Sequence, residues 1–354
     1  MDNFRPTKAV ISLGAIKRNT EKIINKYSGY KYYTAVVKAD CYGYRGFDVV
    51  RAMLDGGANL LAASLVEEGL ALRKEFPEIL VMLFTPADFV GLSAMRDNDI
   101  IATVATLKQA EEAASVKGLR VMIRANGGSD IFGGPTDKEG FLEIWNVLKN
   151  GDCDLTGIYL HSYNAENEAD TLKEYSTFER MTEGLDLSSL EIVSVSNSLT
   201  LPRYEKKPYC NACRLGNIIY KIESEDVQLE NTFSLVTEVL DVFSVKKTQS
   251  IAYGHAFTAM EDNVCVAAVP IGFGDGFSKT NIGRDVFVNG KRYPIVAITM
   301  DISHILVDDS VKKGDEVLLI KDTKHLDEIS AHIHGATEEA VCALNNRVRR
   351  EYVK

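Results

Sequence analysis

The sequence has few of the features that mark secreted, membrane-bound or nucleic-acid-binding proteins. It carries 40 Lys and Arg residues against 50 Asp and Glu residues, and the formal net charge of -10 argues against a surface that binds nucleic-acid phosphates. No apolar run approaches the roughly 18 residues that a membrane helix needs. The first residues, MDNFRPTKAVISL, lack a basic region followed by a long apolar one, so no secretory signal is expected. We therefore predict a cytoplasmic protein that binds neither membranes nor nucleic acid.

Cysteine is also scarce, because six cysteines spread over 354 residues form no disulfide framework. Cys210 and Cys213 form a single C-x-x-C pair, but a structural zinc site needs a second pair or histidines at matching spacing. The next histidine downstream is His255. A redox pair is expected before a helix, whereas the following RLGNIIY has the pattern of a strand. We interpret the pair as coincidental, with zinc or redox chemistry as the alternatives, and predict no metal site.

The sequence does contain a regular alternation of short apolar runs and amphipathic stretches. A first strand, about residues 6–13, precedes a helical pattern over 14–26. Eight apolar runs follow, which as a set are rich in Val, Ile and Tyr: YYTAVVKA, NLLAAS, EILVMLF, IIATV, LRVMIRA, LTGIYLHSY, LEIVSVSN and CRLGNIIY. Helical segments such as VEEGLALRKEF separate them. Runs of this kind are typical of buried parallel strands. The pattern predicts an α/β fold with a TIM-like (β/α)8 barrel over residues 1–230, with an open doubly wound sheet as the alternative.

After residue 230 the pattern changes to strands separated by turn signals such as VNGK and KKGD. We predict a β-rich domain over residues 231–354, with one late helix near 326–334. The first strand of the chain is expected to join this second domain rather than the barrel.

Several polar residues stand at the carboxyl ends of the predicted barrel strands, where barrel active sites gather. They are Lys38, Arg124, His161, Asn197, Ser198, Arg214 and Gly216. Each alone is explained as a solvated strand end or a hydrogen-bonded support. Together, at the single mouth of a barrel, they indicate a site.

The residue types at these strand ends fit the needs of pyridoxal phosphate. A lysine amine drawn out of water is nucleophilic and suits a Schiff base. Asn197, Ser198 and Gly216 could supply the short side chains and backbone N–H groups that bind a phosphate. The imidazole of His161 could stack on an aromatic ring.

The segment AVVKADCYGYRG, residues 35–46, resembles the lysine motif of bacterial alanine racemases, usually AVVKANAYGHG. LAASLVEEGLALR, GIYLHSYNAENE and RLGNIIY are similar to further barrel segments of that family. AYGHAFTA resembles the segment with the family's catalytic tyrosine, and VPIGFGDGF, ITMDISHILVD and the tail EEAVCALNNRVRREYV are similar to its later motifs. The sequence is identified as a member of the alanine racemase family of fold-type III pyridoxal-phosphate enzymes.

This resemblance implies a racemase that interconverts L- and D-alanine with two bases. Lys38 would bind the cofactor covalently and serve as one base. Tyr253, contributed by the partner subunit of a homodimer, would be the other base on the opposite face. Because this sequence lacks the family's arginine at position 131, carboxylate binding would use backbone N–H groups near Met300, or Arg124.

The resemblance also implies how the cofactor is held. Tyr42 and Ser198, the latter beside Asn197, would bind the phosphate with the backbone of Gly216 and Asn217. His161 would pack on the ring. Arg214 would face the pyridine nitrogen, and because a guanidinium keeps its protons, the ring would be a weaker electron sink with fewer side reactions.

Four positions depart from the family pattern. Arg124 stands at a lysine that is often carbamylated, and Ile131 stands at an arginine that orients the substrate carboxylate. Phe273 and Asn346 replace tyrosines that line the entrance and support the catalytic tyrosine. We predict that Arg124 supplies part of the positive charge lost at 131, with simple pairing to Asp130 as the alternative.

These departures leave other functions open. A wider entrance fits a larger or cationic substrate such as serine or ornithine. A basic-amino-acid decarboxylase of similar architecture is weakened by AYGHAF and MDISH, which follow the racemase pattern. A non-catalytic cofactor-binding homologue is weakened by the retention of both Lys38 and Tyr253.

Overall fold

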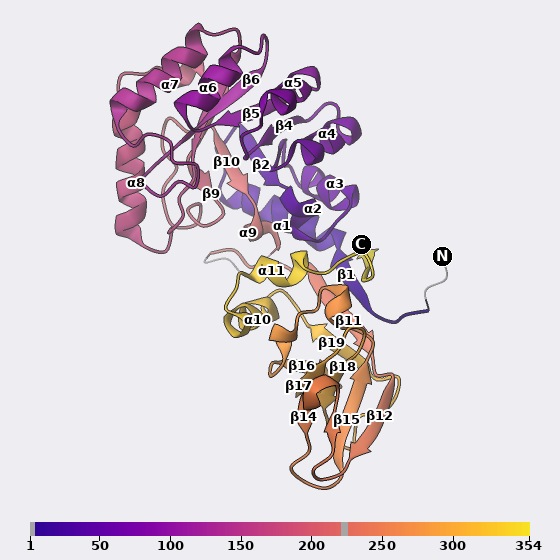
Figure 1. The fold of residues 1–354 in the computed structure, drawn as a ribbon. Helices are drawn as coiled ribbons and strands as arrows, with labels where there is room; N and C mark the ends of the chain where they lie inside the picture. Colours follow the sequence, from indigo (N-terminus) through magenta and orange to yellow (C-terminus); the bar gives the residue numbers. More distant parts are fainter. Residues whose placement is uncertain (1–3, 221–225) are drawn as a thin grey trace.

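The computed structural model describes residues 4–220 and 226–354, and the first half of the chain winds into a barrel of strands (Figure 1). The sheet order is β8-β7-β6-β5-β4-β3-β2-β10-β9, with parallel pairings throughout this series. The strands are β2 (Tyr32–Val36), β3 (Leu60–Ala63), β4 (Leu80–Leu83), β5 (Ile100–Val104), β6 (Arg120–Ala125), β7 (Asp154–Leu160), β8 (Ile192–Ser194), β9 (Ser196–Asn197) and β10 (Ala212–Leu215).

The barrel closes because the two ends of this order, β8 and β9, are separated in the chain by Val195 alone. The order runs along the chain without the reversal that a doubly wound sheet requires. The predicted (β/α)8 class is therefore confirmed, and the open-sheet alternative is wrong. The predicted run LEIVSVSN forms two strands rather than one, because its first part pairs with β7 and its last part with β10.

Helices surround the strands in an outer layer (Figure 1). They are α1 (Leu13–Lys26), α3 (Phe47–Asp55), α4 (Val66–Glu75), α5 (Phe89–Asp97), α6 (Leu107–Ala114), α7 (Lys138–Asn150) and α8 (Glu168–Met181). Side chains of Ser12, Thr106 and Asp137 accept backbone N–H groups at the starts of α1, α6 and α7. Of the helices described, none is long and apolar enough to cross a bilayer.

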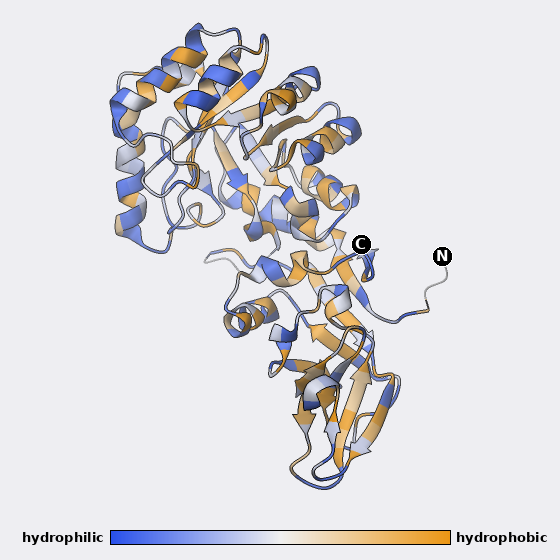
Figure 2. Ribbon diagram, in the orientation of Figure 1, coloured by the Kyte–Doolittle hydropathy of each residue, from blue (hydrophilic) through white to orange (hydrophobic). Residues whose placement is uncertain are grey.

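Burial follows the layers of the barrel. Figure 2 shows apolar strands and helices that are polar on part of their surface. Every residue of YYTAV in β2 and of LLAA in β3 is buried, as expected for strands covered on both faces. The barrel interior is itself a packed core formed by Tyr32, Val36, Leu60, Ala62, Met82, Ile101, Met122, Tyr159, Ile192 and Ala212.

The second half of the chain, together with the N-terminal strand β1, forms a nine-stranded sheet in the order β12-β15-β18-β17-β16-β19-β11-β1-β20. Its strands are β1 (Lys8–Ser12), β11 (Phe233–Glu238), β12 (Asp241–Val245), β15 (Val264–Val269), β16 (Asp285–Val288), β17 (Lys291–Ile298), β18 (Ser303–Leu306), β19 (Glu316–Ile320) and β20 (Arg349–Val353). β1 lies in this sheet, antiparallel to β11 and parallel to β20. A separate hairpin pairs β13 (Ser250–Ile251) with β14 (Phe257–Thr258).

Local signals in the second half agree with the structure at some positions and fail at others. The predicted VNGK turn joins β16 to β17, with φ of 51° at Asn289 and 79° at Gly290. The late helix is α10 (His325–Ile333), but a second helix, α11 (Thr337–Cys342), was not predicted. The predicted strand RLGNIIY is wrong beyond Leu215, because Asn217–Tyr220 forms the short helix α9.

Helix α11 brings the second domain against the mouth of the barrel (Figure 1). Its partner there is the short helix α2 (Lys38–Tyr42), which ends at Gly43 with φ of 80°. A Cβ atom at Gly43 would lie 2.6 Å from the Val341 carbonyl oxygen. Gly43 therefore permits a close backbone contact that joins the two domains directly beside Lys38.

Candidate active site

A pocket of about 530 Å³ opens at the carboxyl ends of the barrel strands. Its volume suits a cofactor or a small ligand. The pocket brings together nine of the eleven residues that the sequence singled out: Lys38, Tyr42, Arg124, His161, Asn197, Ser198, Arg214, Gly216 and Asn217. Tyr253 and Met300 do not line it.

Val37 separates Lys38 from the end of β2, and Lys38 begins helix α2. The next four residues, 39–42, have φ between 51° and 58°, in the left-handed region that residues other than glycine seldom adopt. The Ala39 N–H donates a hydrogen bond of 2.7 Å to the Glu68 carboxylate, which helps to hold this turn. The Lys38 ammonium lies 5.9 Å from the centroid of the Tyr42 ring. The strained turn thus presents Lys38 and Tyr42 to the same pocket.

A small space, called the cradle, is enclosed by Tyr42, Ser198 and Gly216. The Gly216 N–H donates to Ser198 Oγ at 2.8 Å. A Cβ atom at Gly216 would lie 2.6 Å from the Tyr42 hydroxyl and 3.6 Å from Ser198 Oγ, so any side chain there would fill the space between them. Burial, followed by the nearby Glu338, raises the pKa of Tyr42, so its hydroxyl remains a hydrogen-bond donor. These groups can hold an anion of phosphate size.

Arg214 lies buried at the bottom of the pocket. Its Nη2 donates to the Leu160 carbonyl at 2.7 Å and its Nη1 to the Ser194 carbonyl at 3.3 Å, which fixes the guanidinium. The guanidinium carbon lies 5.1 Å from the centroid of the Tyr159 ring. Burial lowers the pKa of Arg214 to about 10, and the side chain is therefore still charged at neutral pH.

His161 follows β7 and lies partly buried among cations. Burial, and then the positive charges of Arg214, Arg124 and Lys38, lower the pKa of His161 to about 3. The imidazole is therefore neutral at physiological pH. It contacts the ring of Tyr163 edge-on, with centroids 4.8 Å apart. A neutral imidazole can pack on an aromatic ring without adding charge to the pocket.

This lowered pKa predicts a pH dependence of stability. Folded His161 takes up a proton near pH 3, whereas an unfolded histidine does so near 6.5, so the unfolded state gains the proton first and stability falls as the pH falls between these values. We expect the free energy of unfolding to depend less on pH in His161→Gln than in the wild type between pH 6.5 and 4. The slope should differ by at most about 1.4 kcal/mol per pH unit. Urea titrations of the cofactor-free protein measure this, and equal slopes in both proteins would contradict it.

Arg124 lies in the pocket wall at the end of β6. Its Nε donates to Asp130 Oδ2 at 2.5 Å, its Nη1 donates to the Tyr159 hydroxyl at 3.3 Å, and its Nη2 donates to the Tyr163 hydroxyl. Burial acts against the charge, but Tyr159 and Asp130 outweigh it and the pKa of Arg124 is raised. The pairing with Asp130 that the sequence left as an alternative is present, and Arg124 also faces the pocket beside Ile131.

Tyr253 and Met300 lie on the surface of the second domain. Tyr253 is 86% exposed and Met300 is 53% exposed. Tyr253 belongs to a short 3-10 turn, Tyr253–His255, at the tip of the β13–β14 hairpin. Ala252 before it has φ of 60° and ψ of 176°, a conformation almost restricted to glycine. A strained hairpin thus presents an exposed tyrosine that is not among the described residues lining the pocket of its own chain.

Several residues of the pocket wall are not indicated by the sequence patterns. Tyr159 lies two residues before His161 on β7, and the two-residue period of a strand could have placed both on one face. Glu338 and Cys342 lie four residues apart on α11 and also line the pocket. No local pattern indicated them, because they arrive from the second domain.

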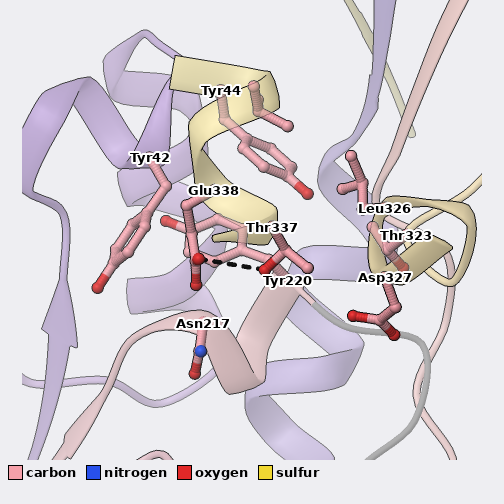
Figure 3. A pocket seen from close by; sticks show the side chains of 10 residues that line it. Tyr42, Tyr44, Asn217, Tyr220, Thr323, Leu326, Asp327, Thr337 and Glu338 are labelled. Carbon is pink, nitrogen blue, oxygen red and sulfur yellow. Dashed lines mark hydrogen bonds between the residues drawn. The ribbon is translucent and has the colours of Figure 1, made fainter. Parts of the chain in front are cut away.

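A smaller cavity of about 30 Å³ adjoins the cradle between the barrel and helices α10 and α11 (Figure 3). Tyr42, Asn217 and Glu338 line both spaces. The Thr337 hydroxyl donates to Glu338 at 3.1 Å, as the figure shows. The buried Tyr220 hydroxyl has no hydrogen-bond partner among the described residues. A cavity of this volume can hold a water molecule.

Comparisons with known proteins agree with this architecture. The family model of the alanine racemase N-terminal domain matches residues 11–224, and that of the C-terminal domain matches residues 232–352. The chain is 29% identical to alanine racemase 1 of Bacillus subtilis, over 99% of this chain and 94% of that protein. It is 30% identical to alanine racemase of Anoxybacillus flavithermus, over 99% and 96%.

A solved structure gives the same result in three dimensions. Alanine racemase from Bacillus anthracis with bound L-Ala-P superposes with a TM-score of 0.91 at 25% identity, covering 100% of this chain and 96% of that one. The chain is thus a two-domain protein in which a β-rich second domain packs against the mouth of a (β/α)8 barrel, beside the pocket. The chain belongs to the alanine racemase family.

Proposed function

We propose that this protein is a pyridoxal-phosphate-dependent amino-acid racemase, most simply of alanine. The observation that carries the proposal is the single pocket in which Lys38 lies beside the cradle of Tyr42, Ser198 and Gly216. Whole-chain similarity to alanine racemases supports the same activity.

The residues present fit pyridoxal phosphate. The cradle would hold the phosphate with Tyr42, Ser198 and the backbone of Gly216 and Asn217, because a Cβ at Gly216 would fill that space. Asn197 supports the turn that follows it and contains Ser198, since its Oδ1 accepts the N–H groups of Leu199 and Thr200 at 2.9 Å and 3.1 Å.

Two bases would carry the proton transfers. When bound, pyridoxal phosphate supplies the electron withdrawal that makes the Cα–H bond of an amino acid acidic. The Lys38 amine would exchange the proton on one face of Cα, and the partner subunit's Tyr253 would exchange it on the other. Arg214 keeps its protons and is held by two carbonyl groups, so it would donate a hydrogen bond without giving up a proton.

The exposed position of Tyr253 supports a homodimer with shared active sites. Tyr253 is 86% exposed and lies outside the pocket of its own chain, so a base at this position must act on another chain's pocket. Met300, half exposed on the same domain, would then contribute to carboxylate binding in the partner's site.

Substrates larger than alanine, such as serine or ornithine, remain the second candidate. Ile131 is 68% exposed at the pocket wall, where a long arginine would occupy more space. Asn346 accepts a hydrogen bond from Arg45 rather than presenting a ring toward the pocket. These features favour an open pocket. A homologue that binds the cofactor without turnover is the remaining alternative.

A racemisation screen tests the proposal. Purified protein with added pyridoxal phosphate is incubated with each common L-amino acid, and formation of the D-enantiomer is followed by chiral chromatography. We expect turnover of alanine. Turnover of serine or ornithine instead would indicate that the open pocket determines which substrate is preferred. No D-amino acid from any substrate, in a protein that binds the cofactor, would favour the non-catalytic alternative.

A further inference from the structure

The loop after β6, residues 126–134, folds around the side chain of Arg124. Asn126 ties this loop together, because its Oδ1 accepts the N–H groups of Gly128 at 2.8 Å and Asp130 at 3.2 Å. Its Nδ2 donates to the Gly134 carbonyl at 2.6 Å. The loop is therefore held by its own hydrogen bonds.

Asp130 is the acidic group that this loop places behind Arg124. Its side chain is 2% exposed and that of Arg124 is 6% exposed. Asp130 Oδ1 accepts the Phe132 N–H at 2.8 Å, and Oδ2 accepts from Arg124 Nε at 2.5 Å. Each carboxylate oxygen of Asp130 thus accepts one hydrogen bond, one from the loop backbone and one from the guanidinium. Breaking such a buried pair leaves an uncompensated charge, which is costly.

The contacts of Arg124 leave part of its guanidinium for a ligand. A guanidinium has five N–H groups, and three are engaged by Asp130, Tyr159 and Tyr163. Arg124 lines the pocket whereas Asp130 does not. The acid therefore lies behind the cation, on the side away from the space in which a substrate would bind.

We infer that Asp130 is a positioning residue that holds Arg124 as the binding group for the substrate carboxylate. This inference rests on the proposed racemase function. Because both members of the pair are unmodified side chains, Arg124 is held in place without a bound anion and without a carbamylated lysine. A simple neutralising role for Asp130 has the opposite consequence: its removal would then free the Arg124 charge and strengthen carboxylate binding.

Asp130→Asn separates these roles. The amide keeps the shape and the acceptor for Phe132 but weakens the hold on Arg124. We expect the KM for the amino acid to rise about ten-fold, the scale of one lost charge-assisted hydrogen bond, with kcat nearly unchanged. Asp137→Asn is the matched control, because Asp137 is an exposed acid that caps α7 outside the pocket. A KM that is unchanged or lower in Asp130→Asn overturns the inference.

A binding measurement that needs no turnover distinguishes this inference from the proposed function. Propionate has the carboxylate of alanine but no amino group, and its affinity for the holoprotein can be measured by calorimetry. We expect weaker binding in Asp130→Asn than in the wild type and Asp137→Asn. If the wild type racemises amino acids but the three proteins bind propionate equally, the inference fails alone. If propionate binding depends on Asp130 and no amino acid is racemised, the proposed function fails alone.

Asp130→Ala gives a second test should the amide variant not fold. This change leaves a space the size of a small carboxylate beside Arg124. Added formate is expected to lower the KM of Asp130→Ala, while in the wild type it can only compete with substrate. Absence of any response to formate in a folded Asp130→Ala protein would contradict the positioning role.

Discussion

Lys38→Ala is expected to abolish racemisation and the covalent attachment of pyridoxal phosphate. Lys38 is the lysine among the residues that line the pocket, and it begins the strained left-handed turn that also carries Tyr42. Its amine would both fix the cofactor and exchange the Cα proton, so one substitution removes attachment and base together. The cradle of Tyr42, Ser198 and Gly216 remains, and weak non-covalent binding of the phosphate is expected to survive.

The measurement is the yellow colour of the purified protein, with borohydride reduction and peptide mapping to locate the attached cofactor. Lys138→Ala is the matched control, because Lys138 is a surface lysine paired with Glu183. We expect this control to retain colour and activity. Cofactor attached to a lysine other than Lys38 would show that the site assignment is wrong.

Tyr253→Phe is expected to reduce racemisation by about 10²–10⁴-fold, the range for a residue that transfers protons. The change removes only a hydroxyl from a side chain that is 86% exposed, so folding and cofactor binding should not change. Steady-state rates in both directions measure the loss. A rate equal to that of the wild type would remove Tyr253 from the mechanism.

Subunit mixing tests whether the second base comes from the partner. Lys38→Ala and Tyr253→Phe proteins are each expected to be defective, but a mixed dimer would contain one site with both native bases. We expect partial recovery of activity after subunit exchange. No recovery, once exchange is verified by differently tagged chains, would indicate self-contained sites.

The fold class could be predicted from the sequence because its signals are local. Buried parallel strands such as β2 and β3 are continuous apolar runs, and the helices between them carry polar faces and N-terminal caps. The turn at Asn289 and Gly290 was likewise readable, because positive φ at two adjacent positions favours these residue types. The sequence pattern does not distinguish helix α9 from a strand, because its three apolar residues, 218–220, suit a strand or a helix equally.

The residues at the ends of the barrel strands, and hence the candidate residues on the barrel side of the pocket, follow from local sequence patterns. Which side chains meet there depends on how distant parts of the chain pack. Asp130 lies behind Arg124 because the loop after β6 folds back on itself, and Glu338 reaches the cradle because α11 packs against Gly43. Sequence periodicity reports which face of an element is buried. It does not report which distant element covers that face, because such contacts form only when the barrel closes and the second domain docks on its mouth.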